Sequence, residues 1–266
     1  MEEIKGLLKR LGNWQYIGLC LIVLLTLVMH FSIIMQLDKP AFDEKFYVTD
    51  ARYILDGKVT ERIEHPPLGK LLIVSGMFLF GDNPLGWRFF SVVFGAICIV
   101  FFYLICHQLG MSPKASFLAT SLLAFENLSF IQAGVAMLDV YSLAFMLVSF
   151  YLYLKGRYLA SGISVGLSAL TKLNGVLALP VILLHWLFTG SAHPRRFLAT
   201  MLSVPASFLL LMPLFDLAIC HRFINPVVQI EKMLDVTIYP TLPGTLRKCS
   251  AAHGTGYYNL RLSPIG

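Results

Sequence analysis

The chain has 266 residues, of which 57% are apolar and only 14% are charged, and its mean hydropathy is +0.72. An ordinary soluble domain carries about 25% charged residues, so this composition excludes a soluble globular enzyme and a disordered chain. The five cysteines are too few for a disulfide scaffold, and the formal charge of +6 forms no basic stripe that would suit nucleic acid. Composition therefore predicts an all-α polytopic membrane protein.

Apolar stretches, taken in chain order, predict the membrane spans. A helix rises 1.5 Å per residue and must cross about 30 Å of hydrocarbon. The stretch 158–188 predicts two short helices, because a single long helix would bury Lys172 near the centre of the bilayer at a cost of several kcal/mol. Seven spans are expected, at about 16–37, 89–109, 115–130, 135–154, 158–170, 174–188 and 197–219.

Basic residues in the short loops favour seven spans over six. With seven spans, every basic loop residue lies on the side of the N-terminus, which the positive-inside rule assigns to the cytoplasm; with six, the last pair moves to the opposite side. Residues 38–86 and the tail 220–266 then lie on the outer side. The basic residues concerned are Lys5, Lys9, Arg10, Lys114, Lys155, Arg157, Arg195 and Arg196.

The longest polar segment between spans is the first outer loop, residues 38–86. Residues 45–56 form an amphipathic pattern, and residues 68–80 would make a helix about 20 Å long, too short to cross. Helices lying along the membrane interface fit both pieces. We expect a transmembrane module at 1–219, with residues 38–86 as its outer catalytic loop.

Ionisable residues from six segments gather on this outer side. Charges beside membrane helices are costly enough to be functional candidates. Asp43 and Glu44 could supply a general base for an incoming hydroxyl, whereas Arg88 and Lys172 could hold a phosphate. The predicted chemistry is group transfer from an anionic, lipid-borne donor. The outer-side residues are Asp43, Glu44, Glu64, His65, Arg88, Glu126, Asp139 and Lys172.

Each candidate also has a structural interpretation. An acidic pair in a loop is commonly only solvated, and His65 before two prolines is typical of a turn. Arg88 at a helix start could anchor to headgroups, and Lys172 could extend to the interface. Gly162 and Gly166 have the spacing of small residues at a helix–helix contact. The sequence contains no Cys/His metal spacing, Walker loop or dinucleotide fingerprint.

Several motifs follow one another in a definite order. Asp43-Glu44 is followed by Glu-His-Pro-Pro-Leu-Gly-Lys at 64–70 and by Phe-Gly-Asp-Asn-Pro-Leu-Gly-Trp-Arg at 80–88, and then by the stretches 136–139 and 166–172. Over residues 16–219 this order resembles the protein O-mannosyltransferase family. Its members are membrane glycosyltransferases of the C-type (GT-C) fold that use a polyprenyl-phosphate sugar. The resemblance covers the amino-terminal seven-helix module of that fold.

The resemblance implies roles for individual residues. Asp43 would be the catalytic base, with Glu44 beside it positioning the acceptor. Arg88 and Lys172 would contact the donor phosphate, and Asp139 would be the second acidic residue of the site. The remaining substrate-binding residues would be His65 and Lys70. Transfer would be one displacement with inversion at the anomeric carbon, with neither metal nor cofactor beyond the polyprenyl-phosphate sugar donor.

The resemblance also implies partners and a location. The expected acceptor is a protein Ser or Thr hydroxyl, and association with a homologous subunit is expected. The membrane is the plasma membrane of a prokaryote or the endoplasmic reticulum of a eukaryote, with the active side facing away from the cytoplasm.

Other functions stay open. The acceptor could instead be a lipid or envelope glycan. Because relatives continue through further spans whereas residues 241–266 contain no hydrophobic run, an inactive fragment or scaffold is also an alternative. A transporter fits less well, because the ionisable residues gather at one membrane edge rather than at the midplane of two related halves.

The one-sided arrangement can be tested by cysteine labelling. In a background without native cysteines, Asp43→Cys and Lys172→Cys are both expected to react with a membrane-impermeant thiol reagent from the same side of the bilayer. Reaction of the two positions from opposite sides would rule out a common site.

Overall fold

The computed structural model describes residues 2–58, 65–189, 194–220 and 225–238, and within these ranges it consists of helices and turns. In chain order the helices are α1 (Glu2–Ile34), α2 (Glu44–Leu55), α3 (Pro67–Phe80), α4 (Pro84–Gln108), α5 (Pro113–Phe125), α6 (Asn127–Ala133), α7 (Leu138–Leu154), α8 (Tyr158–Thr171), the 3-10 helix η1 (Leu173–Leu177), α9 (Ala178–Thr189), α10 (Pro194–Cys220) and α11 (Pro226–Ile238).

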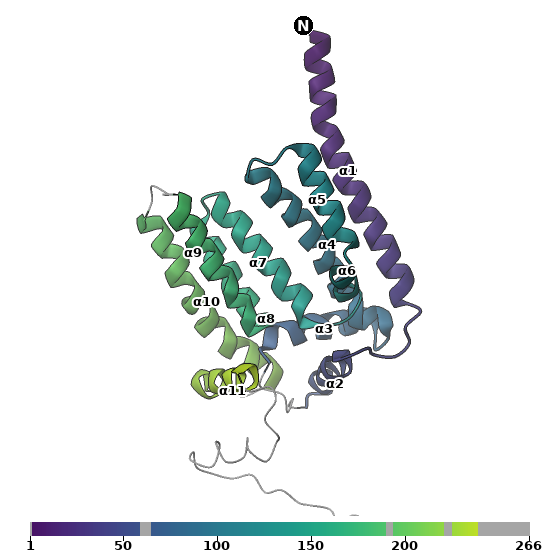
Figure 1. The fold of residues 1–266 in the computed structure, drawn as a ribbon. Coiled ribbons are helices and arrows are strands. Elements are labelled where there is room, and N and C mark those ends of the chain that lie inside the picture. Colours follow the sequence, from purple (N-terminus) through teal and green to yellow (C-terminus); the bar gives the residue numbers. More distant parts are fainter. Residues whose placement is uncertain (1, 59–64, 190–193, 221–224, 239–266) are drawn as a thin grey trace, which may run out of the picture.

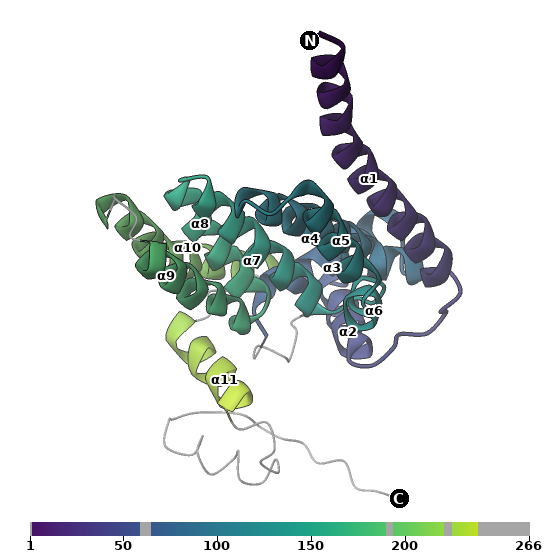
Figure 2. The same cartoon turned by 45° about the horizontal axis from the view of Figure 1, so that its top comes forward.

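The long helices form an up-and-down bundle whose two ends differ. Figure 1 shows α1, α4, α5, α7, α8, α9 and α10 running side by side, with α3 lying across one end and α2 and α11 beside it. We call this the α3 end. The start of α1 and the turns that join α4 to α5 and α7 to α8 lie at the opposite end, and in the turned view of Figure 2 α3 lies behind the bundle. The short helices of the first outer loop therefore cap the bundle instead of extending it.

Within the described ranges, three helices are long and apolar enough to cross a membrane: Tyr16–Ile34, Pro84–Gln108 and Phe197–Ile219. A fourth crossing is available if α6 and α7, which are bent by 107° at their break, are counted as one span. The chain is thus a multi-pass membrane protein. The helices α3, α8 and η1–α9 are apolar but shorter, so the count of seven crossings stays a prediction.

One helix boundary differs from the sequence prediction for a local reason. The stretch expected as one span at 115–130 breaks at Glu126, whose side chain accepts the backbone N–H groups of Leu128 and Ser129 at 2.9 and 2.7 Å. This N-cap ends α5 and starts α6 in a new direction. The expected outer tail, residues 220–266, is described only in part. Residue 220 ends α10 and residues 225–238 include α11, whereas residues 221–224 and 239–266 lie outside the described residues.

The motif at 80–88 builds the sharp turn between α3 and α4. Gly81 has a φ of 87°, and the side chain of Asn83 caps α4 by accepting the N–H of Gly86 at 3.0 Å. A Cβ on Gly86 would lie 2.0 Å from the carbonyl oxygen of Gly81, so only glycine fits there. Much of this motif therefore has a structural purpose, which is to place the first turn of α4 against α3.

Two glycines allow α8 to lie close to α10. A Cβ on Gly162 would lie 2.6 Å from the backbone oxygen of Thr200, and one on Gly166 would lie 1.9 Å from the hydroxyl of Ser207. The helix-packing interpretation of these glycines is confirmed. α8 also contacts α7, through a hydrogen bond between the hydroxyls of Ser142 and Ser168, whose oxygens are 2.9 Å apart.

Gly162→Ala is expected to lower the free energy of unfolding by about 1–3 kcal/mol, because the added methyl group must push α10 away. The measurement is thermal unfolding of the purified protein in detergent. The control is Ile163→Ala, since Ile163 lies next to Gly162 but is exposed. Equal melting temperatures for the two variants would contradict the close α8–α10 contact.

Candidate functional site

The α3 end is organised by a fully buried ion pair between Glu44 and Arg88. Both side chains are 0% exposed. The guanidinium donates from Nε to Oε1 at 2.8 Å and from Nη2 to Oε2 at 2.7 Å. This two-pronged geometry is the strongest form of a carboxylate–arginine contact.

The remaining N–H groups of Arg88 bind the end of α1 and the loop after it. Nη1 donates to the carbonyl oxygens of Ile34 at 3.0 Å and Leu37 at 2.7 Å, and Nη2 donates to that of Lys39 at 3.0 Å. A cation is favourable at a helix C-terminus, where carbonyl groups lack partners. All five N–H groups of the guanidinium are therefore in use.

Glu44 also accepts hydrogen bonds from two backbone N–H groups. Oε1 accepts from Ala136 and Oε2 from Ala41, both at 2.8 Å. Because Arg88 lies in α4 and Ala136 in the turn between α6 and α7, this carboxylate joins the start of α2 to two segments that are distant in the sequence, α4 and the 134–137 turn. The cost of burying the two charges is thus offset by a complete set of partners.

The geometry changes the interpretation of these two residues. Arg88 was expected to contact a donor phosphate and Glu44 to position an acceptor. Neither side chain is exposed, both are fully hydrogen-bonded within the protein, and together they hold the loop that carries Asp43. A headgroup anchor does not fit Arg88 either, since it is 0% exposed.

Asp43, next to Glu44 in the chain, has the opposite environment. It is exposed, and its side chain makes no capping hydrogen bond to α2 although it stands at the N-cap position. The preceding residue, Phe42, is 75% exposed and has a φ of 50°. Positive φ is costly for a bulky residue and is often found at functional sites. The carboxylate of Asp43 is accessible to a ligand.

The motif at 64–70 starts α3 and ties it to α2. Pro67 begins the helix, and Lys70 forms an ion pair with Asp50 at 2.9 Å, with both side chains at most 3% exposed. Lys70, expected to bind substrate, is therefore buried in a pair between two helices. His65 is half-buried with its ring 5.5 Å from that of Tyr47, and Glu64 lies outside the described residues.

A more exposed pair links α2 to the α3–α4 turn. Arg52 donates to Asp82 from Nε at 2.7 Å and from Nη2 at 3.1 Å, and the indole N–H of Trp87 donates to the same carboxylate at 2.6 Å. The hydrogen bonds from Arg52 and, less strongly, from Trp87 lower the pKa of Asp82 against the opposing effect of its partial burial. This pair helps to hold α2 against the start of α4.

Lys172 and Asp139 form a further ion pair that is partly accessible. Lys172 Nζ lies 2.6 Å from Asp139 Oδ1, and the side chains are 32% and 39% exposed. Lys172 has extended backbone angles and separates α8 from η1, while Asp139 lies in the first turn of α7. A Cβ on Gly175 would meet the hydroxyl of Ser168 at 2.2 Å, so glycine lets η1 fold back beside α8.

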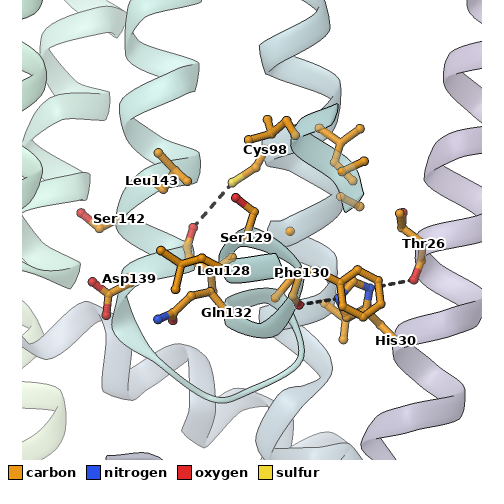
Figure 3. Close-up of a pocket in the computed structure, with 18 of the residues that line it drawn as sticks. Thr26, His30, Cys98, Leu128, Ser129, Phe130, Gln132, Asp139, Ser142 and Leu143 are labelled. Carbon is orange, nitrogen blue, oxygen red and sulfur yellow. Dashed lines mark hydrogen bonds between the residues drawn. The ribbon is translucent and has the colours of Figure 1, made fainter. Parts of the chain in front are cut away.

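This pair lies in the wall of a largely apolar cavity of about 360 Å³. Side chains from α1, α4, the end of α5, α6, α7 and η1 line it, including Val92, Ile99 and Leu143. Figure 3 shows Asp139 on one side of the cavity and Thr26 and His30 on the other. No group of three or more His, Cys, Asp or Glu side chains suited to a metal occurs in the part of the chain that the structure describes.

His30 was not among the sequence candidates. Its ring nitrogens lie 2.7 Å from the carbonyl oxygen of Thr26 and 2.9 Å from that of Phe130, and its ring stacks on Phe130 at 4.1 Å between centroids. It therefore connects α1 to α6 beside the cavity. A single histidine within an apolar span gives no pattern from which this contact could be found.

The fold and the sequence can now be compared with known proteins. The structure of ArnT from Cupriavidus metallidurans in the apo state matches with a TM-score of 0.58 and 21% identity, covering 87% of this chain and 50% of that chain. The fold expected from the sequence, the all-α fold of the C-type membrane glycosyltransferases, is confirmed by this match.

Residues 78–191 match the sequence profile of the dolichyl-phosphate-mannose-protein mannosyltransferase family. The polyprenol-phosphate-mannose–protein mannosyltransferase of Mycobacterium tuberculosis is 31% identical over 152 residues, which are 54% of this chain and 29% of that protein. The protein of the same name from Mycolicibacterium smegmatis is 35% identical over 117 residues, 42% of this chain and 23% of that protein. The resemblance to this mannosyltransferase family is confirmed, and the chain spans less than a third of these relatives' length.

Arg88→Met is expected to lower the free energy of unfolding by about 3–5 kcal/mol, because it leaves Glu44 as an unpaired buried charge. Arg52→Met is the matched control, since it breaks a pair of the same type that is 43–47% exposed and should cost about 1 kcal/mol or less. Denaturant unfolding in detergent measures both. Similar losses in the two variants would contradict the organising role of the buried pair.

Proposed function

We propose that the chain forms the part of a protein mannosyltransferase that binds the donor and starts the reaction. The reaction transfers a mannosyl group from a polyprenyl-phosphate carrier to a Ser or Thr hydroxyl of a protein. It takes place at the α3 end, facing away from the cytoplasm, in a bacterial plasma membrane or an endoplasmic reticulum. The names of the two mycobacterial relatives support this choice of donor and acceptor.

The cavity suits a lipid phosphate. Its apolar walls fit part of an isoprenoid chain, and Lys172 supplies a cation at its polar side. Among the described residues, the ammonium of Lys172 pairs with Asp139, and its side chain is about one-third exposed, so it can turn to a phosphate oxygen. Arg88 has no N–H group left for that contact.

Asp43 then acts as the base. Its carboxylate takes the proton of the acceptor hydroxyl, whose oxygen forms a bond to the anomeric carbon of mannose from the face opposite the phosphate. The bond between that carbon and the phosphate oxygen breaks, its electron pair stays on the lipid phosphate, and configuration inverts. Lys172 stabilises the negative charge on the leaving phosphate, and Asp139 orients the ammonium of Lys172.

The observation that carries this proposal is the contrast between two neighbouring carboxylates. Glu44 is buried with every oxygen occupied, whereas Asp43 is exposed with no capping bond. A base must be reachable by its substrate, and only Asp43 of the two is. The 134–137 turn connects this base to the cavity, because Ala136 binds Glu44 and Asp139 follows three residues later.

Asp43→Asn is expected to reduce transfer by at least about 10²-fold, since an amide cannot accept the proton. The assay follows labelled mannose from polyprenyl-phosphate-mannose to a Ser/Thr-rich peptide, using membranes that contain the chain. Asp56→Asn is the control, because Asp56 is an exposed carboxylate just past the other end of α2 and forms an ion pair with the exposed Lys58.

Membrane insertion of the variant, checked by thiol labelling, should be unchanged. Transfer at the wild-type rate by Asp43→Asn would remove the mechanism. Proteomics of O-linked hexose in cells with and without the gene separates a protein acceptor from a lipid or glycan acceptor, and copurification tests association with a homologous subunit.

A further inference from the structure

Gln132 presents a polar group to the cavity that the protein itself does not use. It lies on α6 and lines the cavity, and its Oε1 atom is buried without a hydrogen bond from any described residue. Leaving a buried acceptor unpaired costs about 1–3 kcal/mol. A ligand that donates a hydrogen bond to this oxygen would recover that free energy.

The position of Gln132 relates it to the Lys172–Asp139 pair. Gln132 and Asp139 lie on either side of the 134–137 turn, and both line the cavity. Figure 3 shows the amide of Gln132 and the carboxylate of Asp139 toward the same side of the cavity, away from His30. The unpaired acceptor thus lies on the side where the proposed phosphate meets Lys172.

The helix that carries Gln132 is held at two points. Glu126 caps its start through the N–H groups of Leu128 and Ser129, and His30 of α1 contacts the carbonyl oxygen of Phe130. Because α6 is capped at its start and tied to α1 through His30, the backbone that carries Gln132 is placed before any ligand arrives. Such preorganisation is what a recognition residue needs.

The chemistry of the acceptor limits what it can bind. A phosphate at the pH of the cell offers mainly acceptor oxygens, which an amide oxygen repels, and an isoprenoid chain offers no polar hydrogen. A sugar hydroxyl does offer a donor. The polar side of the cavity therefore provides a cation for a phosphate and acceptors, Gln132 Oε1 and Asp139, for hydroxyl groups.

We propose that Gln132 is a specificity-determining residue that accepts a hydrogen bond from a hydroxyl of the donor sugar, and so favours the glycosylated lipid phosphate over the bare one. This inference rests on the proposed function, because it takes the cavity to be the site of a lipid-phosphate donor. Product release follows from it: once the sugar has left, the lipid phosphate loses this contact and is held less tightly.

The test compares two ligands on the full chain in lipid nanodiscs: polyprenyl phosphate and polyprenyl-phosphate-mannose. The wild type should bind the mannosylated lipid more tightly. Gln132→Met, which keeps the length of the side chain but removes the acceptor, should lower this preference by about threefold to tenfold, with unchanged affinity for polyprenyl phosphate. Gln132→Glu keeps an acceptor and should retain the preference, because its added charge repels the bare phosphomonoester, with up to two negative charges, at least as strongly as the mannosylated phosphodiester, with one.

Two further variants separate the possible results. Lys172→Met should weaken the binding of both ligands, and that of the more highly charged polyprenyl phosphate at least as much. Ile131→Ala, which changes an exposed side chain of the same helix, should alter neither. Binding of both ligands with an unchanged preference in Gln132→Met, or an equal loss for both, would overturn the role of Gln132. Failure of the wild type to bind either lipid would overturn the proposed function itself.

Discussion

The arrangement of the α3 end depends on one buried contact, the ion pair between Glu44 and Arg88. Two charges removed from water each cost several kcal/mol unless all their hydrogen-bonding capacity is met. Here the guanidinium donates hydrogen bonds to carbonyl groups at the end of α1 and in the loop after it. The carboxylate accepts hydrogen bonds from the N–H groups of Ala41 and Ala136. The loop before α2 can hardly move without breaking several of these bonds, and the exposure of Asp43 follows from the burial of its neighbour.

The ionisable groups at this end fall into two kinds, and the difference bears on function. The pairs Glu44–Arg88 and Lys70–Asp50 are buried and join helices, whereas Lys172–Asp139 is about one-third exposed and lines a cavity. A cation can serve a ligand only if it can exchange its partner for that ligand. Lys172 meets this condition and Arg88 does not, so our proposal assigns the phosphate contact to Lys172 alone.

The proposed donor and acceptor sites are connected through a short piece of chain. The 134–137 turn gives an N–H group to Glu44, stands between Gln132 and Asp139, and follows α6, which His30 holds against α1. In the proposed arrangement the cavity holds part of the lipid chain, Lys172 binds the phosphate and Gln132 accepts a hydrogen bond from the sugar. Asp43 takes the proton of the acceptor hydroxyl at the aqueous side. One short turn thus links the pair that holds the Asp43 loop to the two polar residues of the cavity.

Much of this protein was determined by its sequence alone. Apolar stretches predicted where the long helices lie, the glycine spacing predicted the contact between α8 and α10, and the order of the motifs predicted the family resemblance, because these features depend on residues close together in the chain. Burial was decided only by the tertiary structure. Asp43 and Glu44 are adjacent and chemically alike, yet Glu44 is buried because its partners, Arg88 and Ala136, come from α4 and the 134–137 turn. The unpaired oxygen of Gln132 likewise became visible only once five neighbouring helices had enclosed a cavity around it.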